Sequence, residues 1–366
     1  MTDQSDSPEH SSPTPNKTPI LVTGASGYIA TWIIKMLLEA GYTVHGTVRD
    51  PNRKSSVDPL WAIAKQAPLG TLKLFKADLL DMGSFDEAMA GCSIVMHTAS
   101  PFVVRGFKDS NEALIRPAVE GTRNVLEAAN RTGSVQRVVL TSSVAAIFGD
   151  NADLKEIPSG IFTEEDWNTS SSAHHQPYSF SKKLAEAEAW KIHGAQDRWQ
   201  LVTVNPGMVG GPALTTSSQS TSIDTLRGLG TGRLWPGVPE MRLPWVDVRD
   251  VAAAHLAAAF KPEAEGRHII TNGEPSLLEV ARILRGHFGN KYWFPFIELP
   301  KFIAKWFGRL LDASATPKFI EQNVGYPLKF DNQKSIDKLG ITYTPLSKTF
   351  IDHFQQLLDD GLIKKR

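Results

Sequence analysis

The sequence has a single cysteine among 366 residues, Cys92. One thiol excludes an internal disulfide and a metal site built from several thiolates, so no metal site is predicted. Cys92 opens the apolar segment 92–96, which is typical of a buried strand. We therefore expect a packed, unreactive thiol rather than a nucleophile.

The chain also lacks a surplus of charge and a long apolar run. Lys plus Arg equals Asp plus Glu at 39 each, so no overall field draws the protein to nucleic acid or an anionic membrane. No apolar run approaches the ~20 residues that cross a bilayer. Residues 1–17 lack a secretion signal and predict a disordered tail. We expect a cytoplasmic monomer or homodimer without stable membrane insertion.

Short apolar runs alternate with helical segments in the first 206 residues. The runs that predict strands are 19–23, 43–48, 72–77, 93–97, 137–141 and 201–204, and the clearest helices are 28–40 and 118–130. Such alternation implies parallel βαβ units with right-handed crossovers. The predicted fold class is α/β, a Rossmann-type doubly wound parallel sheet with a smaller C-terminal substrate lobe.

The pattern changes after residue 206. Segment 215–233 is rich in Ser, Thr and Gly and predicts a loop or mobile lid. Residues 247–256 predict a helix with Asp247 as its N-cap and Asp250 in its first turn. The aromatic stretch 292–310 carries interleaved cations. It predicts a helix packing on the lobe, with a substrate wall or a membrane-surface contact as alternatives.

The first strand runs into a glycine loop, residues 23–30. Gly24 permits a tight turn, Gly27 lets the backbone approach a pyrophosphate, and Ala30 replaces a third glycine where helix packs on strand. The N–H groups at the start of the next helix then face the phosphates. Because the loop lies between a strand and a helix, it predicts a dinucleotide site.

The end of the second strand decides which dinucleotide is expected. A site that prefers NAD usually has an acidic residue there, whereas this chain has Arg49, followed by Arg53 and Lys54. These cations suit a 2′-phosphate. Asp50 could still reach a ribose hydroxyl. The prediction is NADP(H), bound by residues 18–206 with 244–260 returning to that domain, and 207–366 forming mainly the substrate lobe.

Tyr178 and Lys182 are four residues apart at the start of a helical stretch, so they share one helix face. A tyrosine that works near neutrality needs its pKa lowered by about three units, which a nearby Lys and an oxidised nicotinamide favour. Ser143 ends the fifth strand, where a hydroxyl would orient a carbonyl. We predict Ser143, Tyr178 and Lys182 as the catalytic group, with Ser142 as the alternative to Ser143.

These motifs together resemble the extended short-chain dehydrogenase/reductases, and within them the dihydroflavonol 4-reductase, cinnamoyl-CoA reductase and methylglyoxal (aldehyde) reductase group. The similarity runs from about residue 19 to 260. It implies that Asp78 and Leu79 contact the adenine, that Lys182 also holds the nicotinamide ribose, and that Asn124 is structural. The predicted cofactor-binding residues are Gly24, Ser26, Gly27, Tyr28, Ile29, Arg49, Arg53, Lys54, Asp78, Leu79, Thr98, Ala99, Ser100, Tyr178, Lys182, Pro206 and Gly207.

Two features depart from the group. In its flavonol-reducing branch an Asn follows the catalytic serine by five residues, whereas this chain has Phe148. An aromatic wall favours a smaller or more apolar carbonyl, and Met208 is expected to line the same site. The pair His174 and His175 precedes Tyr178; adjacent histidines predict an exposed loop without a catalytic or metal role.

The function predicted is NADPH-dependent reduction of an aldehyde or ketone to an alcohol, or the reverse reaction. Alternatives are an NAD-dependent nucleotide-sugar epimerase or dehydratase, and a hydroxysteroid dehydrogenase. Arg49 argues against the epimerase. A redox-sensing regulator that binds NADP without turnover is the alternative outside enzymes, and the retained Tyr178 and Lys182 argue against it.

Overall fold

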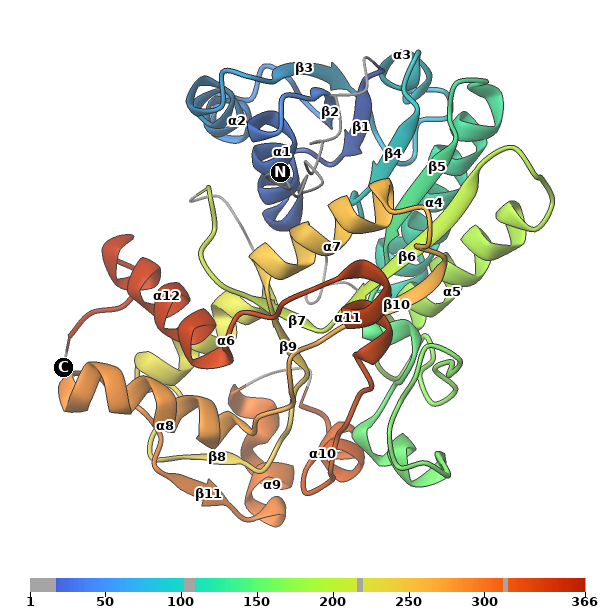
Figure 1. The fold of residues 1–366 in the computed structure, drawn as a ribbon. Coiled ribbons are helices and arrows are strands. Elements are labelled where there is room, and N and C mark those ends of the chain that lie inside the picture. The colour runs from blue at the N-terminus through green and yellow to red at the C-terminus, as the bar shows by residue number, and fades with distance from the viewer. Residues whose placement is uncertain (1–17, 102–108, 216–219, 312–314, 366) are drawn as a thin grey trace, which may run out of the picture.

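The computed structural model describes residues 18–101, 109–215, 220–311 and 315–365 (Figure 1). The predicted tail, residues 1–17, lies outside them. The central sheet has seven parallel strands in the order β10-β6-β5-β4-β1-β2-β3. They are β1 (Ile20–Thr23), β2 (Thr43–Val48), β3 (Thr71–Lys76), β4 (Ile94–His97), β5 (Arg137–Thr141), β6 (Gln200–Pro206) and β10 (Gly266–Ile270). The predicted doubly wound α/β fold is confirmed.

Helices cover both faces of this sheet (Figure 1). One face carries α1 (Tyr28–Glu39), α2 (Lys54–Gln66) and α7 (Val248–Phe260); the other carries α3 (Asp86–Met89), α4 (Arg116–Arg131) and α5 (Pro177–His193). In β1, Ile20 and Val22 pack with the first set of helices and Leu21 with the second. Because both faces are buried, the strand reads as an unbroken apolar run. Helix α1 ends before Gly41, whose φ of 83° is the expected left-handed stop.

The C-terminal half builds a smaller lobe around a second apolar core. Its paired strands are β7 (Met208–Gly210) with β9 (Trp245–Asp247), and β8 (Gly237–Pro239) with β11 (Ile297–Leu299). Its helices are α6 (Thr221–Gly230), α8 (Leu277–Phe288), α9 (Lys301–Leu311), α10 (Pro317–Asn323) and α12 (Leu346–Asp359). Helix α11 (Gln333–Leu339) packs instead on the central sheet, where Leu339 joins the core of α1, α2 and α7. Strand β10 lies beside β6 in the sheet, although it follows segments of the lobe in the sequence.

The prediction of a loop over 215–233 is wrong for residues 221–230, which form α6. The Ser220 hydroxyl accepts a hydrogen bond from the Ile223 N–H and caps the helix. Leu226 and Leu229 lie one turn apart and are fully buried. Burial of this apolar face outweighs the weak helix propensity of the Ser, Thr and Gly residues around it.

The aromatic stretch 292–310 divides into two parts. Tyr292 and Phe294 are buried in the loop before α9 and pack against Phe354 of α12. On α9 itself, Phe302 and Trp306 are 65% and 79% exposed. The loop therefore packs on the core of the lobe. Helix α9 packs as predicted through Ala304, which is buried with Ile320 of α10, while the two rings face solvent. No helix of the described ranges has the length and apolarity needed to cross a membrane.

Cys92 is fully buried. Burial raises the pKa of its thiol to about 12. The prediction of a packed thiol is confirmed, and the raised pKa disfavours the thiolate, which is the reactive form.

Candidate active site

The glycine loop joins β1 to α1 at the carboxyl edge of the sheet, where the strand order reverses between β1 and β4. Gly24 has a φ of 65°, and a Cβ there would stand 2.9 Å from the Cα of Ala99. Gly27 is the N-cap of α1 and offers no side-chain hydrogen bond. The first N–H groups of α1 therefore keep their capacity to bind an anion such as a pyrophosphate.

The cations predicted to read the 2′-phosphate follow β2. Arg49, Arg53 and Lys54 are exposed. Within the described residues no ion pair engages Arg49. The Asp50 carboxylate accepts the backbone N–H of Asn52 at 2.9 Å and so closes its own turn. This edge accordingly offers free positive charge, which fits NADP(H) better than NAD.

Asp78 and Leu79 follow β3, and Asp78 is exposed at this edge. Its carboxylate accepts the Leu80 N–H at 2.9 Å. The Asn124 amide donates to the Leu79 carbonyl oxygen at 2.7 Å. Asn124 thus makes the structural contact that the family resemblance implies.

Residues 98–100 connect β4 to the neighbouring elements. The Thr98 hydroxyl donates to the Thr23 carbonyl oxygen at 2.5 Å, and the Ala99 N–H donates to the Thr23 hydroxyl at 3.1 Å. Ser100 Oγ accepts Lys182 Nζ at 3.2 Å. The segment that the family places along the dinucleotide is therefore tied to β1 and α5.

Helix α5 brings Tyr178 and Lys182 to the end of β5. It begins at Pro177, and proline suits the first position of a helix. The Lys182 Nζ lies 5.9 Å from the ring centroid of Tyr178. Tyr178 forms a side-chain hydrogen bond with Ser143, whose own hydroxyl accepts the Ala145 N–H at 3.1 Å. The three predicted catalytic residues come together in space.

The electrostatics of this group differ from the expectation. Burial raises the pKa of Tyr178 to about 12, and its hydrogen bond with Ser143 opposes that rise. Burial lowers the pKa of Lys182 to about 8, against the attraction of Glu186. The surroundings that the chain itself supplies therefore keep the phenol protonated at neutral pH, which is the form that donates a proton.

A buried carboxylate that the sequence did not single out lies one turn beyond Lys182. Glu186 is fully buried and pairs with Arg267 of β10, with 2.6 Å between Nε and Oε1. Its other donors are Ser142, which bonds Oε2, and Asn205, Thr203 and Trp190 at 2.8, 3.4 and 3.3 Å. This commits the Ser142 hydroxyl to Glu186, whereas Ser143 meets Tyr178. Nothing in the sequence spacing pairs a helix residue with a strand residue 81 positions away.

The predicted substrate residues lie at the start of the lobe and beyond Ser143. The Phe148 ring centroid lies 5.6 Å from that of Phe162 and 5.1 Å from that of Phe330. These two partners are buried and Phe148 is partly exposed. Met208 is half-buried against the core of the lobe. A Cβ on Gly207 would stand 2.5 Å from the Pro244 carbonyl oxygen, so glycine is required beside Pro206.

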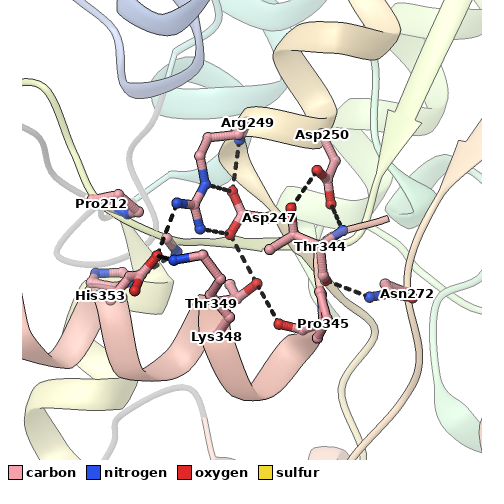
Figure 2. A network of polar contacts seen from close by, with 12 residues as sticks. Pro212, Asp247, Arg249, Asp250, Asn272, Thr344, Pro345, Lys348, Thr349 and His353 are labelled. Atoms are coloured by element: carbon pink, nitrogen blue, oxygen red, sulfur yellow. Dashed lines mark hydrogen bonds and ion pairs between the residues drawn. The ribbon is translucent and has the colours of Figure 1, made fainter. Parts of the chain in front are cut away.

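A polar network joins the lobe to the sheet (Figure 2). Asp247 caps α7, as predicted, by accepting the Arg249 N–H at 2.8 Å. The Arg249 guanidinium also pairs with Asp247 at 2.6 Å and with Asp352 of α12 at 2.8 Å. Thr349 of α12 donates to Asp247 at 2.9 Å. Asp250 accepts the backbone and hydroxyl of Thr344, both at 2.8 Å.

The same network reaches the glycine loop. The Tyr28 hydroxyl donates to the Gly211 carbonyl oxygen, and the Gly211 N–H donates to His353 Nδ1 at 3.1 Å. Trp32, one turn further along α1, donates to the Pro212 carbonyl oxygen at 2.8 Å. The helix that would hold the pyrophosphate is thus bonded to the segment after β7 and through it to α12.

The fold and these motifs have known relatives. The model of the NAD dependent epimerase/dehydratase family matches residues 20–272. A cinnamoyl-CoA reductase of Medicago truncatula is 36% identical over 344 residues, 92% of this chain and 95% of the relative. Tetraketide alpha-pyrone reductase 1 of Arabidopsis thaliana is 35% identical over 354 residues, 95% and 97% of the two chains. The structure of yeast methylglyoxal/isovaleraldehyde reductase Gre2 complexed with NADPH superimposes with a TM-score of 0.76 at 29% identity, over 94% of this chain and 100% of Gre2.

Proposed function

The chain belongs to the NAD dependent epimerase/dehydratase family, within the extended short-chain dehydrogenase/reductases that include cinnamoyl-CoA reductases, and from this membership we propose that it reduces an aldehyde or ketone to an alcohol with NADPH. It is an NADP-dependent oxidoreductase. The observation that carries the proposal is the meeting of Ser143, Tyr178 and Lys182 at the end of β5, at the edge where the glycine loop lies.

The proposed roles follow from the contacts. When bound, NADPH would supply the hydride that adds to the carbonyl carbon. The Ser143 hydroxyl orients the carbonyl oxygen beside the Tyr178 phenol, and the phenol donates its proton to that oxygen as charge develops. The Lys182 ammonium, bonded to Ser100, would hold the nicotinamide ribose, and its charge favours the phenolate left behind.

The proposed function is tested by NADPH consumption at 340 nm with α-keto aldehydes, aliphatic and aromatic aldehydes, β-keto esters and steroids. Turnover with any carbonyl class supports it. Binding of NADPH without turnover of any carbonyl would favour the regulator, and activity on nucleotide sugars alone would favour the epimerase.

We expect Arg49→Ala to raise the KM for NADPH about 10-fold or more and to leave the KM for NADH nearly unchanged. The reason is that only NADPH carries the 2′-phosphate, and one charge-assisted contact is worth about 1.5–3 kcal/mol. Steady-state kinetics with each cofactor measure the effect. Lys65→Ala, at the far end of α2, is the control and should change neither constant. Equal losses with both cofactors would contradict a role in phosphate recognition.

Phe148 is proposed to form one wall of the substrate site, which favours carbonyls with an apolar side. Of its three-ring cluster it is the ring that reaches solvent, and it lies five residues beyond Ser143. We expect Phe148→Asn to lower kcat/KM for apolar aldehydes about 10-fold more than for polar ones, since lost apolar contact costs about 1–3 kcal/mol. Phe162→Leu, inside the same cluster, should lower stability and leave this ratio unchanged. Equal losses for both substrate classes would show that Phe148 only packs.

A further inference from the structure

The two histidines before Tyr178 have different surroundings. His174 is exposed, as predicted, whereas His175 is buried. The His175 Nε2 lies 2.6 Å from the Asp150 Oδ2, and the two side chains are 7% and 3% exposed. The prediction of an exposed loop is therefore wrong for His175. Burying two polar side chains costs free energy unless each is hydrogen-bonded, so the partners of this pair have to be identified.

Gln176 separates this pair from the catalytic helix. Its φ of 53° makes it the single non-glycine residue of the described chain in the left-handed region. Its side-chain amide donates to Asp150 Oδ1 at 2.6 Å and to the Gly149 carbonyl oxygen. Such a backbone conformation persists only where surrounding contacts determine it. Pro177 then opens α5, and Tyr178 follows as its second residue.

Asp150 also receives a donor from the lobe. The Asn323 amide at the end of α10 donates to Asp150 Oδ1 at 2.6 Å, and the Asn323 Oδ1 accepts the Asn151 N–H at 3.0 Å. Asp150 and Asn323 are 2% and 4% exposed. One buried carboxylate thus bonds three side chains, from the segment before α5 and from α10.

We propose that Asp150 and His175 are positioning residues that hold the Tyr178 phenol against Ser143, and that Asn323 makes this position depend on the seating of α10. Ser143 and Asp150 belong to the same connection after β5, and His175 lies three residues before Tyr178. The Asp150–His175 pair therefore joins the two segments that carry the hydroxyls, close to the point where those hydroxyls meet. The inference rests on the proposed reductase function.

The test compares three histidine variants of the full chain. His175→Ala should lower kcat at least about 10-fold, with KM for NADPH and carbonyl unchanged within two-fold, because the cofactor contacts lie elsewhere. His175→Gln should restore kcat to within about three-fold of the parent, since an amide nitrogen can still donate to Asp150. His174→Ala, one residue away and exposed, should match the parent. The kcat of Asn323→Ala should lie between those of His175→Ala and the parent.

A readout independent of turnover separates this inference from the proposed function. In protein labelled with fluorotyrosine, six tyrosines give 19F signals, and Tyr178→Phe identifies the signal of Tyr178. That signal should shift in His175→Ala and stay in place in His174→Ala and His175→Gln. An unmoved Tyr178 signal in His175→Ala would overturn the positioning role of Asp150 and His175. Equal loss of kcat in His175→Ala and His175→Gln would overturn it as well. If the parent reduces no carbonyl, the proposed function fails, and the 19F comparison still tests whether Asp150 and His175 position Tyr178. If His175→Ala does not fold, the Asn323→Ala signal decides it in the same way.

Discussion

Replacing Tyr178 by Phe is expected to lower turnover at least about 100-fold while the fold and the affinity for NADPH stay as they are. The change removes one hydroxyl, and general acid catalysis of this kind is worth about 10²–10⁴-fold. Its phenol bonds Ser143, and burial, which raises the pKa of Tyr178 to about 12, keeps the proton on it throughout the neutral range. Single-turnover NADPH oxidation measures the effect.

A matched control tests whether the loss is specific. Tyr326→Phe also removes only a phenol hydroxyl, from a ring that stacks under Lys155 and Lys301 outside the site, and it should leave turnover unchanged. NADPH fluorescence titration and thermal melting should give parent values for both variants. Near-normal turnover of Tyr178→Phe would exclude Tyr178 as the acid.

The pH dependence of the parent provides a related expectation. Burial lowers the pKa of Lys182 to about 8, so the ammonium is present below that pH and lost as pH rises through it. Reduction of the carbonyl should therefore fall above about pH 8, well before Tyr178 itself ionises. Retention of full kcat to pH 10 would contradict a role for the Lys182 charge.

The second large effect concerns stability. Arg267→Ala is expected to lower the free energy of unfolding by about 3–5 kcal/mol, because it leaves the Glu186 carboxylate buried without its cation. Arg267 also donates to the carbonyl oxygens of Glu164 and Asp166, at 2.8 and 2.6 Å, so its loss releases the segment before α5 as well. Urea denaturation followed by circular dichroism measures the change.

The exposed pair of Arg116 with Glu112 supplies the comparison for this result. Arg116→Ala should leave the urea midpoint within error of the parent, since exposed ion pairs contribute little. Similar urea midpoints for Arg116→Ala and Arg267→Ala would show that the buried Glu186–Arg267 pair contributes no more to the free energy of unfolding than an exposed pair does.

The parts of the molecule that the sequence predicted are those set by local patterns. The apolar run of β1 and the glycines after it lie within ten residues, and the spacing of four between Tyr178 and Lys182 is a property of one helix. The partners of Glu186 and Asp150 lie up to 173 residues away. Such pairs arise from the crossovers of the chain, which no local periodicity encodes.

The errors over α6 and His175 share that cause. The composition around α6 is that of a loop, and only the core of the lobe makes Leu226 and Leu229 an apolar face. His175 is next to an exposed histidine in a polar segment, and only Asp150 distinguishes it. In both places a distant contact decides the environment of a residue whose neighbours in sequence indicate the opposite.

The network in Figure 2 limits the order in which contacts can form during synthesis of the chain. A chain growing from its N-terminus releases α1 and Gly211 long before Asp352 and His353, which hold Arg249 and Gly211. A nascent chain without residues 346–359 has every strand of the sheet but none of these α12 contacts. The N-terminal end of α1 thus acquires its full set of supporting bonds only after residues 346–359 have been made, and contacts of such long sequence separation form slowly.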